Sequence, residues 1–97
     1  ILDYINNRKD LNLIGKSKIH NKNRAPTISF YSNDKSSKEI SRNLHKYKIA
    51  TRNDNFYAWR CLKAIGIDLN DGVVRLSLTH YNSKEDVKKL INALEFI

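Results

Sequence analysis

A single arginine, Arg75, lies in the middle of a stretch that is otherwise built for burial. Residues 73–79 alternate between two sets of side chains, and this period of two predicts a β-strand. A charge that is taken out of water must be paired. A guanidinium offers a planar fork that matches a carboxylate through two parallel hydrogen bonds. Arg75 could therefore form a salt bridge with an aspartate or glutamate of its own chain, or bind the carboxylate of a ligand.

Other polar residues of the same strand bear on this choice. Ser77 and Thr79 share the face that carries the arginine, so we expect them to line a polar cleft beside it. His80 ends the strand and could either reach a site there or stabilise the following turn. We expect His20, in a polar loop, and His45, on a charged helix, to be solvated.

The sequence gives little support for a catalytic nucleophile or a metal site. Cys61 is the only cysteine, so no internal disulfide can form and a reducing, cytoplasmic setting is expected. Its position beside Leu62 on a predicted helix favours a small packed thiol over a reactive one, which would need access and a lowered pKa. The sequence offers no zinc-site spacing, Ser-His-Asp set, glycine-rich phosphate loop or paired carboxylates, so we assign no catalytic residue.

The composition limits the class of protein. A chain of 97 residues is expected to form one domain, residues 1–97, and no apolar run has the length of a membrane span. The chain begins without methionine and contains none, which suggests a domain of a longer protein. The net charge is +8, with the densest basic patch at Lys16, Lys18, Lys22 and Arg24. No aromatic residue interleaves with this patch as a stacking platform would require, so a generally basic surface is favoured over a nucleic-acid site.

Periodicity and capping signals predict the order α-β-β-α-β-α-β-α. The expected helices cover residues 1–8, 36–47, 56–65 and a segment from 83 onward, and the expected strands cover 11–14, 25–31, 49–52 and 73–79. Ser36 and Ser83 are the expected N-caps, and residues 53–55 are expected to turn. The connections are too short for a large parallel sheet. We therefore predict an α+β fold with a small, mainly antiparallel sheet of three to four strands and helices packed on one face.

Four motifs occur in order along the chain, and they resemble one family. They are RAPTISF at 24–30, IATR at 49–52, NFYA at 55–58 and GVVRLSLTHYNS at 72–83, the last followed by a helix signal. Together they resemble the C-terminal small domain of class V aminotransferases, and in particular the cysteine desulfurase-like branch. The resemblance covers nearly the whole chain.

The resemblance implies a dimeric enzyme that uses pyridoxal phosphate, held by a lysine of a larger domain over which the small domain closes. It implies that Arg75 binds the α-carboxylate of an amino-acid substrate, with Asn55, Tyr57 and His80 as candidates for the active-site loop. The complete enzyme would be a desulfurase-like lyase or an aminotransferase. Its partners would be the amino acid, its own large domain and a second subunit. The isolated segment would hold no cofactor and would be inactive.

The sequence departs from the family pattern at two places. In cysteine desulfurases a sulfur-accepting cysteine stands where Tyr57 stands here, and Cys61 lies four residues later, about one helical turn away. The pair His45-Lys46 lacks the Gly-Pro that accompanies the cofactor lysine, so we interpret it as surface. Two other functions stay open: a small basic α+β binding module that senses a ligand or contacts RNA, and a degenerate family member kept for dimer assembly.

Overall fold

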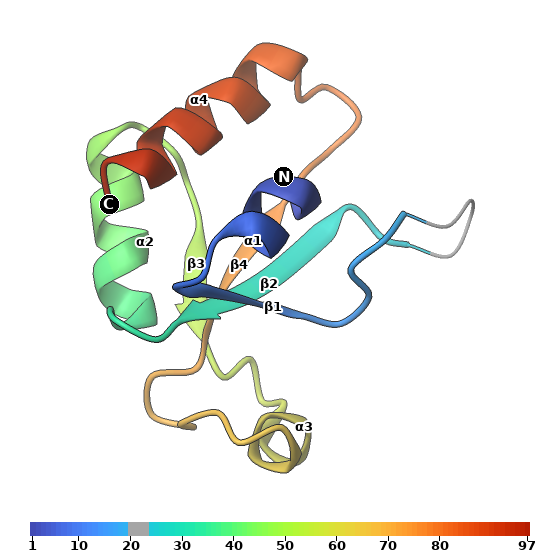
Figure 1. Cartoon of the computed structure of the whole chain (residues 1–97), viewed down its shortest axis with the longest axis vertical. Helices are drawn as coiled ribbons and strands as arrows, with labels where there is room; N and C mark the ends of the chain where they lie inside the picture. Colours follow the sequence, from blue (N-terminus) through green and yellow to red (C-terminus); the bar gives the residue numbers. More distant parts are fainter. Residues whose placement is uncertain (20–23) are drawn as a thin grey trace.

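The fold is described from a computed structural model, which covers residues 1–19 and 24–97. The predicted loop at residues 16–24 lies partly outside this range, as do His20 and Lys22. The elements are α1 (Leu2–Asn7), β1 (Leu11–Ile14), β2 (Thr27–Ser32), α2 (Ser37–Lys46), β3 (Arg52–Asp54), α3 (Trp59–Ala64), β4 (Val73–Ser77) and α4 (Lys84–Glu95) (Figure 1). This order confirms the one predicted from periodicity.

The four strands form one antiparallel sheet in the order β1-β2-β4-β3. Strand β4 is flanked on both sides, so its middle residue, Arg75, lies near the centre of the sheet. Arg75 faces Ser29 of β2 on one side and Arg52 of β3 on the other. The predicted α+β fold with a small antiparallel sheet is confirmed.

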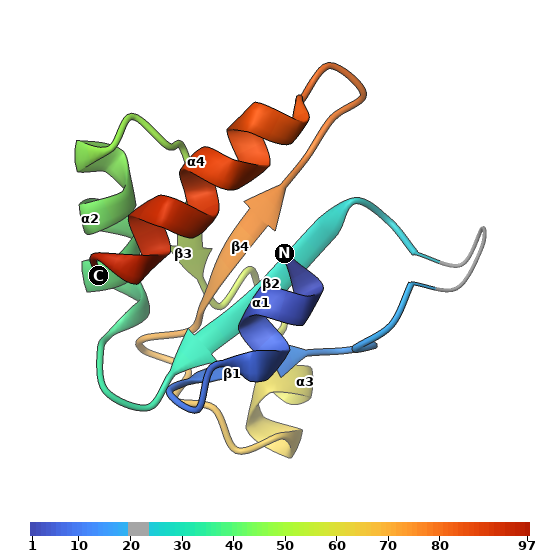
Figure 2. The same ribbon diagram turned by 45° about the horizontal axis from the view of Figure 1, so that its top comes forward.

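Helices α1, α2 and α4 form a layer over one face of the sheet (Figure 2). Alternate residues of the central strands point into this layer: Ile28 and Phe30 from β2, Val74 and Leu76 from β4. The helices contribute the buried side chains Leu2, Ile5, Ile40, Leu44, Leu90, Ala93 and Leu94. Burial of one such aliphatic or aromatic side chain contributes about 1.5–3 kcal/mol. This core fixes which face of β4 turns inward, and so it directs Arg75 to the opposite face.

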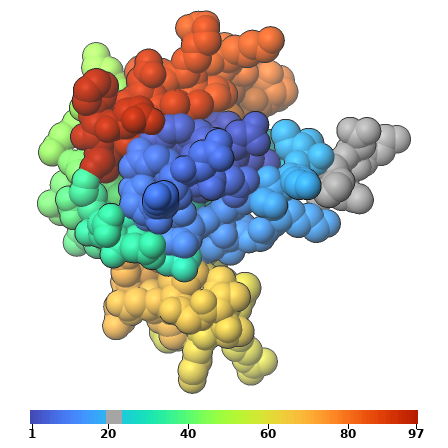
Figure 3. Space-filling view, in the orientation of Figure 1, coloured from blue at the N-terminus to red at the C-terminus, as the bar shows by residue number. Residues whose placement is uncertain are grey.

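The third helix lies apart from this layer. Helix α3 sits at the end of the sheet where β4 begins, and its segment forms a separate lobe below the main body (Figure 3). Its Leu62 packs with Ile67 and Val73 in a second, smaller cluster. The lobe is therefore held by few apolar contacts, close to the start of the strand that carries Arg75.

The third strand begins later than the sequence predicted. We expected a strand at 49–52 and a turn at 53–55, but β3 covers Arg52–Asp54. The Ile49 N–H donates to the Leu44 carbonyl oxygen at 3.1 Å and closes the last turn of α2. Because that backbone group is engaged with the helix, pairing with β4 starts only at Arg52.

The predicted helix at 56–65 is shorter, because Phe56 and Tyr57 have φ angles of 53° and 60°. These left-handed angles are incompatible with a right-handed helix. Helix α3 therefore starts at Trp59, and the apolar side chains of Trp59 and of the C-cap residue Ile65 are 55% and 50% exposed. No helix of the described chain is long and apolar enough to cross a bilayer.

The two predicted N-caps form. The Ser36 hydroxyl accepts from the Glu39 N–H at 3.1 Å, without the reciprocal bond expected of a capping box. Ser83 and Asp86 form the complete box, with Ser83 N–H donating at 2.9 Å and Asp86 N–H donating at 3.2 Å. Each such cap stabilises its helix by about 1 kcal/mol.

Candidate functional site

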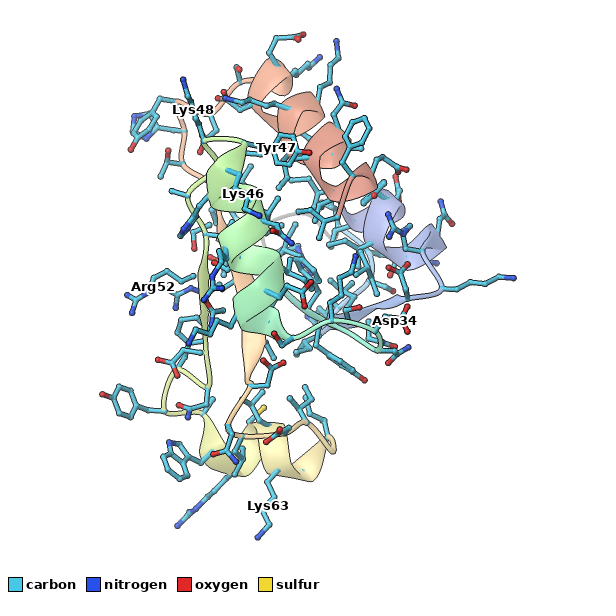
Figure 4. The ribbon with its side chains drawn as sticks, turned by 90° about the vertical axis from the view of Figure 1, so that its left-hand side faces the viewer. Asp34, Lys46, Tyr47, Lys48, Arg52 and Lys63 are labelled. Atoms are coloured by element: carbon cyan, nitrogen blue, oxygen red, sulfur yellow. The ribbon has the colours of Figure 1, made fainter. Side chains whose placement is uncertain are left out.

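The face of the sheet opposite the helical layer carries the candidate site. Register places Ile14, Ser29, Arg75 and Arg52 in one row across the four strands, and opposite residues in a ladder share a face. Arg52 extends from β3 away from α1 and α4 (Figure 4). The row therefore presents two guanidinium groups side by side on the face that the main core leaves open.

Arg75 is half-buried and has no acidic partner. The described residues include every aspartate and glutamate of the chain, and the ion pairs they form are Arg8–Asp10 and Lys88–Glu85. The alternative that Arg75 forms an internal salt bridge is therefore wrong. Its neighbour is instead the Phe56 ring, whose centroid lies 4.1 Å from Arg75 Cζ. The ring contacts one side of the guanidinium and accepts none of its hydrogen bonds in the way a carboxylate would.

The loop after β3 brings Phe56 to this position at a cost in backbone strain. Two successive residues with left-handed φ, Phe56 and Tyr57, cost about 1–2 kcal/mol each. Asn55 holds them: its Oδ1 accepts from the Tyr57 N–H at 3.0 Å, and its Nδ2 donates to the Leu69 carbonyl oxygen at 3.3 Å. The strain and the bonds that maintain it fix the direction of the Phe56 ring.

A close backbone approach fixes the same loop from the other side. Gly72 has a φ of 68°, and a Cβ atom there would lie 2.6 Å from the Asn55 nitrogen and closer still to the Asp54 carbonyl. Only glycine permits this contact between the start of β4 and the end of β3. The positions of Phe56 and Arg75 are therefore coupled through the backbone.

Hydrogen bonds from helix α2 hold the segments that lead into β3 and β4, the two strands that carry Arg52 and Arg75. Both carboxylate oxygens of Asp71 accept from the Ser37 N–H at 2.9 Å, and the Ser37 hydroxyl donates to the Gly72 carbonyl oxygen at 3.2 Å. Further along the helix, the Ser41 hydroxyl bonds the Thr51 hydroxyl at 2.9 Å. These bonds position the residue before Arg52 and the turn before β4.

The structure brings some predicted site residues together and separates others. Asn55 and Tyr57 lie in the loop that contacts Arg75 through Phe56, and the Tyr57 side chain is 92% exposed. His80 is exposed beyond the other end of β4, with its ring 5.2 Å from that of Tyr81. The three candidates for one active-site loop therefore lie in two places.

Ser77 is the last residue of β4, and Thr79 lies just beyond it. They line a cavity of about 330 Å³ between the segment before β3 and the start of α4, and Arg75 is not among its lining residues. The Thr79 N–H and hydroxyl are both bound to Asn82 Oδ1, at 2.7 and 3.2 Å. The polar cleft that Ser77 and Thr79 are expected to line beside Arg75 stays a prediction.

The candidate nucleophile and cofactor lysine lie elsewhere. Cys61 is exposed, which contradicts the packed thiol expected from the sequence. Lys46 is exposed on α2 and donates to Asn43 Oδ1 at 2.9 Å, as expected for surface. Lys46 and Lys48 lie at one end of the molecule and Lys63 at the other, with Arg52 between them (Figure 4). Across residues 1–19 and 24–97, no group of three or more His, Cys, Asp or Glu side chains could hold a metal ion.

The shifted pKa values belong to structural contacts away from this face. A hydrogen bond from Arg8 lowers the pKa of the Asp10 carboxyl, and the same bond raises the pKa of Arg8. Burial raises the pKa of Tyr4, whose hydroxyl accepts from Arg8 at 2.6 Å. The Ser83 backbone N–H lowers the pKa of Asp86 in the cap of α4. These groups join α1, β1 and α4 and do not face Arg75.

Sequence reasoning missed two residues of the site, Arg52 and Phe56. Arg52 ends the strand predicted at 49–52, and Phe56 begins the helix predicted at 56–65. Their relation to Arg75 depends on the β3–β4 register and on left-handed backbone angles. The run Asn53-Asp54-Asn55, which tolerates such angles, was the one signal that an irregular loop precedes the helix.

Comparison with known proteins gives a consistent result. A family model described as aminotransferase class V matches residues 1–90. A curated relative, the aminotransferase-like protein FGM3 of Gibberella zeae, is 31% identical over 98 residues, which cover 100% of this chain and 24% of the relative. The chain therefore spans about a quarter of the length of that relative.

Two solved structures have the same fold over nearly the whole chain. The apo structure of a cysteine desulfurase from Thermococcus onnurineus NA1 is 26% identical with a TM-score of 0.79, covering 98% of this chain and 22% of that one. The cysteine desulfurase CsdA of Escherichia coli, in an S-sulfonic acid form, is 23% identical with a TM-score of 0.77, covering 97% and 21%. At 23% identity the second likeness bears on fold alone.

Proposed function

This chain belongs to the class V aminotransferase family, and from that premise we propose that it is the C-terminal small domain of an enzyme that acts on an amino acid. The match of the family model to residues 1–90 confirms the predicted resemblance to class V aminotransferases. In the proposed enzyme, residues 1–97 bind the substrate carboxylate and close over an active site that a larger domain and a second subunit complete. The proposed location is the cytoplasm.

The observation that carries this proposal is the half-buried Arg75 guanidinium on the open face, without an acidic partner among the described residues. Phe56 shields one side of the guanidinium and leaves its N–H groups free of any carboxylate of the chain. A substrate carboxylate supplies the missing charge and can accept two parallel hydrogen bonds. Arg75 therefore binds and orients the substrate, and Tyr57 and Asn55 lie at the edge of the same site.

Three lysines of the described chain, Lys46, Lys48 and Lys63, are not placed to hold pyridoxal phosphate beside Arg52. Lys46 is engaged with Asn43 on the outside of α2, and Lys48 and Lys63 lie at the two ends of the molecule, away from Arg52 (Figure 4). As the family resemblance implies, we propose that the large domain holds the cofactor, which would supply the electron sink for bond cleavage at the amino acid. What this chain contributes is the carboxylate-binding arginine and the loop that fixes it.

The experiment uses the whole protein loaded with pyridoxal phosphate. The variant Arg75→Gln should raise KM for the amino acid about 10- to 100-fold, because one charge-assisted hydrogen-bonded pair is worth about 1.5–3 kcal/mol. The matched control is Arg42→Gln, which removes an exposed arginine on α2. Assaying sulfide and keto-acid release separates a lyase from an aminotransferase.

Three results would contradict the proposal. They are a whole protein without the visible absorbance of bound pyridoxal phosphate, an Arg75→Gln enzyme with an unchanged KM, and an equal rise in KM for Arg42→Gln.

A further inference from the structure

A second guanidinium lies beside the one assigned to the substrate carboxylate. Arg52 is opposite Arg75 in the β3–β4 ladder, where the Cβ atoms of opposed residues are about 5 Å apart. Like charges placed directly opposite each other destabilise a sheet. The pair is therefore a cost to folding that needs a compensating group.

The described residues place an aromatic ring beside the two arginines but no ion-pairing carboxylate. The Phe56 centroid lies 4.1 Å from Arg75 Cζ and 5.9 Å from Arg52 Cζ, both within the range of a cation–π contact. Phe56 itself has a strained backbone, with a φ of 53°. An observed outlier of this kind points to a functional constraint. One ring thus orients both guanidinium groups.

The carboxylates of the segment from β3 to β4 accept hydrogen bonds from backbone N–H groups. Asp54 Oδ1 accepts from the Asn55 N–H at 2.7 Å, and Asp68 Oδ1 accepts from the Asn70 N–H at 2.9 Å. Both oxygens of Asp71 accept from the backbone at the start of α2. The three acidic residues from the end of β3 to the start of β4 therefore bond backbone groups, and neither Arg52 nor Arg75 forms an ion pair with a described carboxylate.

We propose that Arg52, Phe56 and Arg75 form one anion-binding unit with two subsites, so that the substrate is an amino acid whose side chain also ends in an oxyanion. The inference rests on the proposed function, in which Arg75 takes the α-carboxylate. Arg52 binds the side-chain anion, and the Phe56 ring holds the two guanidinium groups apart and in fixed directions. Arg52 determines specificity, and Phe56 positions the two groups that bind.

The test measures binding of two four-carbon acids to the whole protein loaded with its cofactor. Succinate carries two carboxylates and butyrate one, and isothermal titration gives a Kd for each. Wild type should bind succinate about tenfold more tightly than butyrate, which corresponds to ~1.4 kcal/mol. Arg52→Gln should remove this preference by weakening succinate alone, and Arg75→Gln should weaken both acids.

The controls separate charge, fold and function. Arg42→Gln lowers the net charge equally at an exposed site and should keep the preference. Arg52→Lys keeps the charge without the planar fork and should keep part of it. Equal affinities for the two acids in wild type, or a preference that survives in Arg52→Gln, would overturn the inference. Butyrate binding that depends on Arg75 would still support the proposed function in that case, whereas a wild type that binds neither acid would overturn both.

Discussion

Replacing Gly72 with alanine should destabilise the fold well beyond the usual cost of such a change. The residue has a φ of 68°, and left-handed backbone costs a residue with a side chain about 1–2 kcal/mol. The added methyl group would also overlap the Asp54 carbonyl and lie 2.6 Å from the Asn55 nitrogen. These are backbone atoms that cannot rotate away, and overpacking of this kind costs a further 1–3 kcal/mol or so. The expected total is about 2–5 kcal/mol.

Gly66 provides a matched control within the same chain. Its φ is 79°, but nothing lies within 4 Å of the Cβ position. Gly66→Ala should therefore show the backbone cost alone, about 1–2 kcal/mol. Urea denaturation of residues 1–97, followed by circular dichroism, gives the midpoint and slope for each variant. If the two variants lose the same free energy of unfolding, the close approach of β4 to the loop does not constrain the fold as argued.

The same substitution also tests the coupling of the loop to the site. A shift of Asp54 and Asn55 would displace the Phe56 ring from Arg75, because Phe56 directly follows Asn55 in the chain. In the whole protein, Gly72→Ala should therefore raise KM for the amino acid, whereas Gly66→Ala should leave it unchanged. A wild-type KM in a folded Gly72→Ala enzyme would separate the loop from substrate binding.

Two further predictions concern single contacts. Phe56→Leu should raise KM about 2- to 30-fold with kcat retained, because a cation–π contact is worth about 0.5–2 kcal/mol. Phe56→Tyr keeps an aromatic ring and should keep the wild-type KM. Steady-state kinetics of the whole protein check this, and the same KM in both variants would refute a role for the ring. The pKa of Asp10 is lowered by Arg8, so its stabilising effect is present above the unfolded pKa near 4 and is lost as pH falls through the lowered folded value. Asp10→Asn should flatten the acid side of a melting-temperature profile between about pH 2 and 7, and a profile parallel to that of the wild type would refute this contribution.

The sequence predicts those parts of the fold that local patterns specify. The alternation in β4 places Val74 and Leu76 on the core side and Arg75 opposite, and the structure confirms this. Ser36 and Ser83 fix the starts of α2 and α4 through bonds to residues three positions ahead. In each case the deciding contacts are close in sequence or follow directly from burial of one face.

The site depends on contacts that local patterns do not contain. The opposition of Arg52 and Arg75 follows from strand register, and a shift of one residue would place the two side chains on different faces. The loop geometry depends on the close approach of Gly72 and on bonds from Asn55 to Tyr57 and Leu69. The helical period of residues 56–65 predicted a helix at this position. In the structure Phe56 precedes the helix, and its ring contacts Arg75 and Arg52.

Two partly buried arginines of this chain, Arg8 and Arg75, have very different partners. Arg8 donates to both oxygens of Asp10 at 2.7 Å and to the Tyr4 hydroxyl at 2.6 Å. Its positive charge and its hydrogen-bond donors are therefore paired within the folded chain. Arg75 receives an aromatic ring and a second arginine in place of a carboxylate. A chain that can build the first arrangement gains nothing in stability from the second. The absence of an anion beside Arg75 in the described chain supports the proposal that the substrate supplies it.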